Sequence, residues 1–181
     1  MNEFYFVRHG QTDANLKGIM CGGKWDLELN STGLEQAALA AENFKKKVQT
    51  INSICVSPLI RARQTAEFFA QKFQLPLIQI DEIQEWDIGA WEKVAFESIK
   101  ADFLGDGEPP GTGETRKDFQ ARVQLGFNKC LYYPGPVLMV SHGGVGLALQ
   151  KFLGTSANKI ENCIPFHVYR NAQGNWMAKS I

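Results

Sequence analysis

Short apolar runs alternate with amphipathic helix patterns through most of this 181-residue chain, and this alternation constrains the fold more than any other feature. Strands that alternate with helices build a largely parallel sheet covered on both faces. We therefore predict a three-layer α/β/α sandwich with a largely parallel central sheet, as a single domain over residues 1–181. The strands are predicted at 4–7, 51–56, 76–80 and 137–140, with a closing hairpin of 164–169 and 176–178.

Two helix starts carry local signals. Thr32 and Glu35 have the spacing of a capping box, which predicts Thr32 as the N-cap of a helix over 33–48. Ser57 and Pro58 predict the start of the next helix, with a capping hydroxyl and a proline at the first position. Further helices are predicted at 94–103, 116–131 and 143–153, and the Gly- and Pro-rich stretch 105–113 is predicted to be a loop within the domain.

Bulk composition excludes several classes of function. Lys plus Arg equals Asp plus Glu at 19 each, so no overall field attracts nucleic acid or a membrane surface, and any electrostatic function is local. No apolar run approaches the length of a membrane span, and no signal-peptide pattern is visible at the start. Four well-separated cysteines, Cys21, Cys55, Cys130 and Cys163, predict reduced thiols in a cytoplasmic protein. Oligomeric state is not predicted.

Basic residues gather where three predicted strands end. Arg8 and His9 follow the first strand, Arg61 lies in the first turn after Ser57 and Pro58, and His142 follows the strand 137–140. Ligands of parallel sheets bind beyond the carboxyl ends of the strands. Backbone N–H groups add donors there, in particular at Gly143 and Gly144, which open the last helix. Together these groups predict a phosphate site.

Glycine and the neighbouring basic residues refine this interpretation. Gly10 is expected to let a ligand approach the backbone closely. Arg63 lies two residues beyond Arg61, about 200° around the helix, so only one of the two arginines can face the pocket. His167 is expected to be structural. A histidine metal centre is the rival interpretation, but the adjacent arginines disfavour a cation and no His-Glu-x-x-His spacing occurs.

A neutral histidine that faces a phosphate can attack phosphorus and form a phosphohistidine. Arginines and a second, protonated histidine would stabilise the phosphoryl oxygens. The leaving alkoxide needs a general acid, for which a carboxylic acid is suited. The irregular acidic stretch offers five candidates, and physical chemistry alone leaves them open: Asp81, Glu82, Glu85, Asp87 and Glu92.

Four ordered motifs resemble the histidine phosphatase superfamily, also called phosphoglycerate-mutase-like. They are Arg8-His9-Gly10-Gln11-Thr12 with Asn15, Ser57-Pro58-Leu59-Ile60-Arg61-Ala62, Glu85-Trp86-Asp87-Ile88-Gly89-Ala90-Trp91-Glu92, and Ser141-His142-Gly143-Gly144. The resemblance runs from residue 4 to about 150. Asn162-Cys163-Ile164 resembles the segment that leads into the family's closing strands.

The resemblance implies a role for each matching residue. His9 is the residue that becomes phosphorylated, and Arg8, Arg61 and His142 hold the phosphoryl group. Asn15 contributes to this pocket, and Glu85 is the implied proton donor. Gly22 and Gly23 are implied to line the substrate side. Thr112 and Thr115 depart from the family's Gly-Gly-Glu-Ser stretch, and Lys93 replaces the usual glycine after Trp-Glu, so substrate preference in the 102–115 region is open.

Within this family the chain is expected to be a phosphatase that acts on a small phosphomonoester without cofactor or metal. The region 93–113 leaves little room for the substrate-enclosing insertion of the cofactor-dependent mutases. The compact form is similar to alpha-ribazole and broad-specificity phosphatases. The alternatives are a phosphoglycerate mutase, a phosphohistidine-protein phosphatase and a non-catalytic phospholigand-binding domain.

Overall fold

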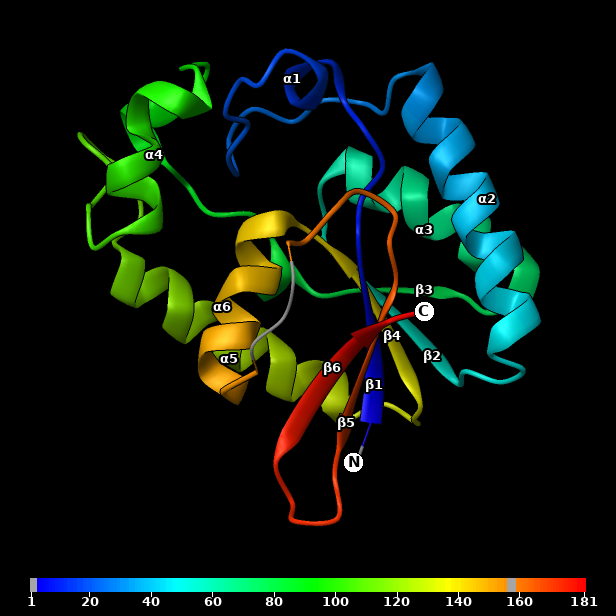
Figure 1. Cartoon of the computed structure of the whole chain (residues 1–181). Helices are drawn as coiled ribbons and strands as arrows, with labels where there is room; N and C mark the ends of the chain where they lie inside the picture. The colour runs from blue at the N-terminus through cyan, green and yellow to red at the C-terminus, as the bar shows by residue number, and fades with distance from the viewer. Residues whose placement is uncertain (1–2, 156–158) are drawn as a thin grey trace.

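A computed structural model of the chain describes residues 3–155 and 159–181. Its central sheet has six strands in the order β3-β2-β4-β1-β5-β6 (Figure 1). Strands β3, β2, β4 and β1 are parallel, and β5 and β6 are antiparallel to their neighbours. The strands are β1 (Glu3–Arg8), β2 (Ser53–Val56), β3 (Leu77–Gln79), β4 (Val137–Ser141), β5 (Phe166–Arg170) and β6 (Trp176–Ser180). The predicted largely parallel sheet is confirmed.

Helices cover both faces of this sheet, as the three-layer prediction required (Figure 1). The α-helices are α1 (Asp13–Leu16), α2 (Ser31–Lys47), α3 (Ile60–Phe73), α4 (Phe96–Leu104), α5 (Arg116–Leu131) and α6 (Gly143–Leu153). Two short 3₁₀ turns, η1 (Asp81–Ile83) and η2 (Gly89–Trp91), lie in the acidic stretch before α4. No helix in these described ranges is long and apolar enough to cross a bilayer.

The alternation of side chains along β1 explains the two cores. Tyr5 and Val7 pack with residues of α2 and α3, whereas Phe4 and Phe6 pack with residues of α5 and α6. Successive residues of a strand point to opposite faces, so one fully apolar strand supplies both layers. The Phe4 side of the sheet also holds Trp86 and the other aromatic side chains of the stretch before α4.

Both predicted N-caps are wrong. The cap of α2 is Asn30, whose side chain accepts the Gly33 N–H at 2.9 Å, so the helix begins at Ser31 and Thr32 lies inside it. Helix α3 begins at Ile60, with Leu59 as its N-cap and no capping side chain. The Ser57 hydroxyl lies before the helix and contacts a histidine ring instead.

Helix α4 begins two residues later than predicted because the preceding backbone is engaged elsewhere. Met20 N–H donates to the carbonyl of Val94 at 2.9 Å, and Lys93 N–H donates to the carbonyl of Met20 at 2.9 Å. A further bridge pairs Ile19 with Ala95. These pairings hold Lys93 at a φ of 65° and Ala95 in an extended conformation, which helical dihedral angles would not allow. Helices α5 and α6 have the predicted bounds.

The sheet order brings the ends of three strands together. Arg8 of β1 lies beside Ser141 of β4, and Val140 of β4 lies beside Val56 of β2. The residues that follow these strands therefore emerge side by side. This is the arrangement that the phosphate-site prediction required of the three strand ends that precede His9, Arg61 and His142.

Candidate active site

His9 follows β1 directly and its ring is fixed in one orientation. Its Nδ1 lies 2.7 Å from the carbonyl oxygen of Gly10. Because a carbonyl can only accept, Nδ1 must carry the proton, and the lone pair of a neutral ring then resides on Nε2. The backbone is held as well: His9 N–H donates to Ser141 at 2.9 Å, and Asn162 Nδ2 donates to the His9 carbonyl at 2.7 Å.

Gly10 packs closely against the backbone of α2. This role differs from the predicted one, in which Gly10 lets a ligand approach the backbone. A Cβ at this position would lie 2.4 Å from the carbonyl oxygen of Gly33 in α2. Gly10 N–H donates to the Thr65 hydroxyl at 3.0 Å, and that hydroxyl donates to the Arg61 carbonyl at 2.8 Å. The loop that carries His9 is thus tied directly to helix α3.

Arg61 is only 1 % exposed, although a guanidinium is strongly hydrated when free. Its Nη2 donates to the Gly22 carbonyl at 3.0 Å, and its Nη1 donates to the Trp25 carbonyl and to Asp26, each at 3.3 Å. Arg63 is exposed and donates to Gln79 at 3.0 Å. The prediction that only one of the two arginines can face the site is confirmed, and that one is Arg61.

Arg8 is held less completely than Arg61. Its Nη1 donates to the carbonyl of Ile160 at 3.0 Å. The Nε atoms of Arg8 and Arg61 are buried and have no partner among the described residues. Buried donors without partners are uncommon, and an anion between these two guanidinium groups would satisfy them.

His142 lies beside His9, with ring centroids 5.2 Å apart and ring planes at 60°. It is fully buried at the N-cap position of α6, but its side chain makes no capping bond. Its Nε2 lies 2.7 Å from the Ser57 hydroxyl, and its Nδ1 has no partner among the described residues. Ser57 was not predicted to contact the site.

The positive surroundings disfavour further protonation of both rings. Burial, followed by the charges of Arg61 and Arg8, lowers the pKa of His9 well below its ordinary value of 6.5. Burial, Arg61 and His9 likewise lower the pKa of His142. In the free protein both imidazoles are therefore neutral at pH 7, which suits His9 as a nucleophile and differs from the protonated second histidine predicted above.

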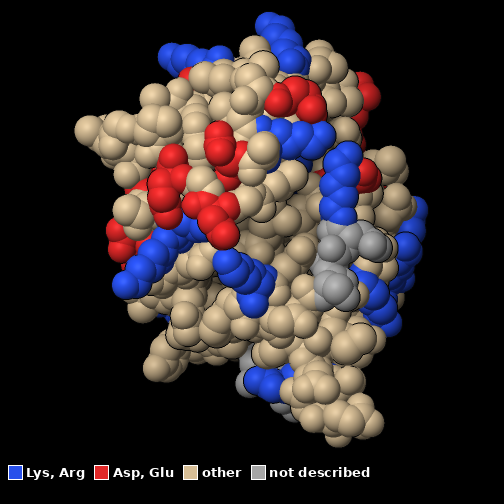
Figure 2. Space-filling model, turned by 60° about the vertical axis from the view of Figure 1, so that its left-hand side comes forward, with Lys and Arg blue, Asp and Glu red and all other residues tan. Residues whose placement is uncertain are grey.

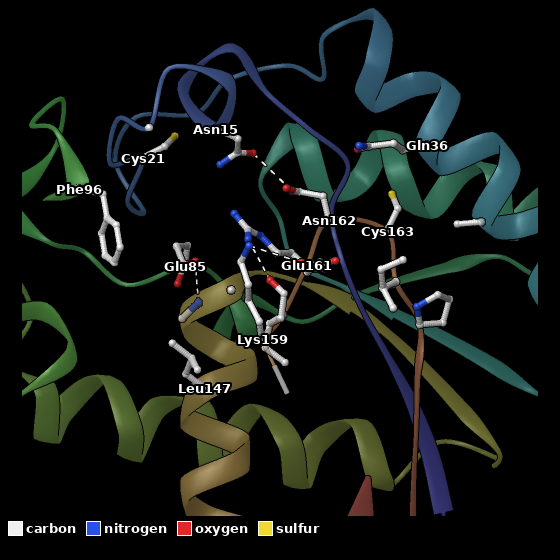
Figure 3. Close-up of a pocket in the computed structure, with 18 of the residues that line it drawn as sticks. Asn15, Cys21, Gln36, Glu85, Phe96, Leu147, Lys159, Glu161, Asn162 and Cys163 are labelled. Carbon is white, nitrogen blue, oxygen red and sulfur yellow. Dashed lines mark hydrogen bonds and ion pairs between the residues drawn. The ribbon is translucent and has the colours of Figure 1, made fainter. Parts of the chain in front are cut away.

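Glu85 is the candidate acid that reaches the cavity (Figure 3). Its Oε2 accepts the Gly144 N–H at 3.0 Å, and its Oε1 accepts the Trp86 N–H at 2.9 Å. A Cβ on residue 144 would lie 2.4 Å from Oε1, so glycine is needed there. The other four candidates line no part of this cavity and have partners elsewhere: Asp81 with Gln79, Glu82 with Lys129, Asp87 with Lys24, and Glu92 with the N–H groups of Lys24 and Trp25.

Asn15 and Asn162 form an amide pair at the rim (Figure 3). The Oδ1 of Asn15 accepts the Thr12 N–H at 3.1 Å and lies 3.5 Å from Asn162 Nδ2. This leaves the Asn15 amide nitrogen directed away from Asn162, so that it can donate to an anion. Asn162 was predicted only as part of a connecting segment, and Asp26 was not predicted at all. Polar residues in irregular segments give no periodic signal.

Gly22 and Gly23 are buried and do not line the cavity. A Cβ on Gly22 would lie 2.5 Å from Ile88, and one on Gly23 would lie 2.6 Å from the Glu85 carbonyl. Their place in the structure therefore differs from the substrate-side lining implied by resemblance: Gly22 holds Arg61, and both permit close packing. Gly143 does line the cavity, beside the Arg8 side chain.

A cavity of about 1040 Å³ opens over these residues and continues past Asn162 and Cys163 to helix α2. Arg8, Asn15, Glu85 and Gly143 belong to its wall, whereas His9, Arg61 and His142 are buried and do not. Of the predicted phosphate-binding side chains, those of Arg8 and Asn15 reach this cavity directly. On the face shown in Figure 2, side chains of both charge signs are interspersed.

Residues 3–155 and 159–181 contain no group of three or more His, Cys, Asp or Glu that could hold a metal ion. The four cysteines carry free thiols. His167 lies on β5, where its Nε2 contacts Glu3 at 2.7 Å. Metal independence and a cytoplasmic location remain predictions.

The fold and the paired histidines and arginines define a class of phosphoryl-transfer protein, and the sequence comparison agrees. The profile of the histidine phosphatase superfamily (branch 1) matches residues 4–175, so this chain belongs to that superfamily.

Particular relatives bear both phosphatase and mutase names. An uncharacterized phosphatase, PhoE, of Bacillus subtilis (strain 168) is 36% identical over 82% of this chain and 76% of its own. A probable phosphoglycerate mutase, GpmB, of Proteus mirabilis (strain HI4320) is 32% identical over 98% of this chain and 89% of its own. A mycobacterial glucosyl-3-phosphoglycerate phosphatase, determined as a complex with VO3, superposes with a TM-score of 0.81 at 25% identity, over 99% and 97% of the two chains.

The lowered pKa values of His9 and His142 make the stability of the fold pH-dependent. Below pH 6.5 the unfolded chain binds protons that the folded chain does not, so the free energy of unfolding falls as pH falls. Each imidazole contributes a loss on the order of 1 kcal/mol between pH 7.5 and 5.5. Urea denaturation in phosphate-free buffer measures this change.

The double variant His9→Gln with His142→Gln should flatten this pH dependence, and His167→Gln should leave it intact. A free energy of unfolding that stays constant in the native chain between pH 7.5 and 5.5 would contradict the buried, neutral assignment.

Proposed function

We propose that this chain is a phosphomonoesterase that hydrolyses a small phosphorylated metabolite through a phosphohistidine on His9. One observation carries the proposal: the His9 ring donates through Nδ1 to Gly10, so its Nε2 keeps a lone pair beside two guanidinium groups whose buried Nε atoms have no partner among the described residues. A nucleophile next to unsatisfied cationic donors suits phosphoryl transfer. Membership of the superfamily and the phosphatase names of relatives support the same activity.

In the first step, Nε2 of His9 attacks phosphorus and the bond from phosphorus to the ester oxygen breaks. Arg8, Arg61 and His142 hold the non-bridging oxygens, with Asn15 and the N–H of Gly143 as further donors. The Glu85 carboxyl group delivers a proton to the departing oxygen, so the product leaves as an alcohol. His9 then carries the phosphoryl group.

In the second step, water attacks the phosphohistidine. The Glu85 carboxylate takes a proton from this water, which restores the acid for the next turnover. The bond from phosphorus to Nε2 breaks, and inorganic phosphate leaves the arginine pair. No metal or organic cofactor takes part in this scheme, and the partner that we propose is the small phosphorylated substrate alone.

The wall of the cavity beyond Arg8 favours a phosphatase over a phosphoglycerate mutase. On the side of α4 and α6 this wall is apolar, with Met20, Phe96, Phe103, Leu104 and Leu147. The cations among the described lining residues are Arg8, Lys159 and, at the distant end of α2, Lys47. Lys159 lies 3.4 Å from Glu161. A leaving group with its own carboxylate would meet few free positive charges here.

Phosphoglycerate mutase activity is the second candidate, since relatives such as the one from Proteus mirabilis bear that name. A mutase returns the phosphoryl group to a bound sugar-acid intermediate, whereas a phosphatase releases it to water. Incubation with 3-phosphoglycerate separates the two: interconversion to 2-phosphoglycerate would favour the mutase.

The free thiols support a reducing compartment, and we propose the cytoplasm.

Replacement of His9 by alanine removes the proposed nucleophile. We expect hydrolysis of p-nitrophenyl phosphate to fall by at least about 1000-fold, because the reaction then lacks its covalent route. His167→Ala, a histidine outside the site, is the matched control and should retain activity, and EDTA should not reduce native turnover. Unchanged turnover in His9→Ala would overturn the proposal, and strong loss with EDTA would favour a metal site.

Glu85→Gln tests the proton donor through the leaving group. Turnover of an alkyl phosphate should fall about 100-fold, whereas p-nitrophenyl phosphate should lose much less, because p-nitrophenolate scarcely needs a proton. Glu82→Gln, in the same acidic stretch but bound to Lys129, should not discriminate between the substrates. Equal losses on both substrates in Glu85→Gln would argue against its role as general acid.

A further inference from the structure

We infer that Ser57 is a positioning residue that fixes the tautomer of His142, so that the neutral His142 ring presents an Nδ1–H donor to the phosphoryl group. This inference rests on the proposed function for its catalytic consequence. The tautomer itself rests on hydrogen bonds alone. Ser57 is a buried serine that was not among the predicted site residues.

Ser57 is fully buried directly after β2 and has few possible partners. Its backbone N–H donates to the carbonyl of Val140 at 3.1 Å. Its hydroxyl oxygen accepts the N–H of Leu59 at 3.3 Å and lies 2.7 Å from Nε2 of His142. One hydroxyl therefore has a donor on one side and an imidazole nitrogen on the other.

The single proton of this hydroxyl determines the arrangement. If Ser57 donates to Nε2, its oxygen accepts from Leu59, and both the hydroxyl and Nε2 are satisfied. If Nε2 carried the proton of the neutral ring instead, the hydroxyl would accept twice and its own proton would be buried without an acceptor. An unmade buried hydrogen bond costs about 1–3 kcal/mol. The first arrangement is favoured, and it places the ring proton on Nδ1.

The remaining nitrogen then has the polarity that a phosphate requires. Nδ1 of His142 is buried, has no partner among the described residues, and belongs to a ring 5.2 Å from that of His9. As a donor it would bind a phosphoryl oxygen, whereas a bare lone pair would repel one. Neutral His142 can therefore donate to a phosphoryl oxygen without an extra proton, which burial and the nearby cations disfavour. Its charged or titratable neighbours are Arg8, His9, Arg61, Arg122 and, through Gly144, Glu85.

Nitrogen NMR of selectively labelled histidine reports the tautomer in the native chain without any substrate. The expected spectrum at pH 7.5 has His142 protonated at Nδ1 and unprotonated at Nε2. A proton on Nε2 would overturn the inference. Because this readout is independent of turnover, it holds even if the chain proves not to be a phosphatase.

The variant Ser57→Ala leaves the tautomer free. We expect kcat/KM for p-nitrophenyl phosphate to fall about 10-fold or more at pH 8, the loss of one buried hydrogen bond. In the nitrogen NMR spectrum at pH 7.5 we expect Ser57→Ala to change His142 from the single Nδ1-protonated form to a mixture of both neutral tautomers, because Nε2 has lost the donor that selects one of them.

Ser53→Ala is the matched control, since Ser53 is a buried serine at the other end of β2 whose hydroxyl donates to Pro134 at 2.8 Å. It should retain the native His142 tautomer and the native kcat/KM. A native His142 tautomer in Ser57→Ala as well would show that Ser57 does not select it and would overturn the inference.

Discussion

A buried guanidinium group, that of Arg61, and a half-buried one, that of Arg8, lie beside two buried imidazoles where three strands end, and the rest of the site depends on holding this positive charge in place. Burying a charged group is expensive unless hydrogen bonds replace its water. The Arg61 guanidinium donates to the carbonyls of Gly22 and Trp25 and to the Asp26 carboxylate. The Arg8 guanidinium donates to the carbonyl of Ile160. Burial, followed by the charges of Arg61 and Arg8, lowers the pKa of His9, and the same two arginines keep buried donors without partners among the described residues. In the proposed mechanism these arginines therefore serve both phosphate binding and the nucleophilicity of His9.

The irregular segments around the sheet serve this arrangement. The stretch from Gly22 to Asp26 wraps the Arg61 guanidinium and also caps the start of α3, because Asp26 accepts the Ile60 N–H at 2.9 Å. Arg122 of α5 donates to the carbonyls of Glu82 and Gln84 at 3.0 and 2.9 Å and so fixes the segment that carries Glu85. Arginine side chains of α3 and α5 thus satisfy backbone carbonyls of these irregular segments.

Sequence periodicity predicted the scaffold because each strand and helix has a regular burial pattern. The rule that ligands bind where parallel strands end also predicted that His9, Arg61 and His142 lie together, and resemblance singled out Glu85 from five carboxylates. Local capping signals were less reliable. Thr32 was predicted as the N-cap of α2, but the N-cap is Asn30, whose side chain accepts the N–H of Gly33 three residues later. Asp26, Ser57 and Asn162 were missed as site residues because their contacts span 35, 85 and 153 positions, and no local pattern encodes such partners.

The central claim is that the phosphoryl group passes through His9. Rapid mixing with a phosphomonoester labelled at phosphorus, followed by an alkaline quench that preserves phosphohistidine, tests it directly. The account predicts label on the peptide that contains His9, formed faster than turnover and lost at the rate of turnover. Steady product release with no labelled enzyme, or label on another residue, would contradict it.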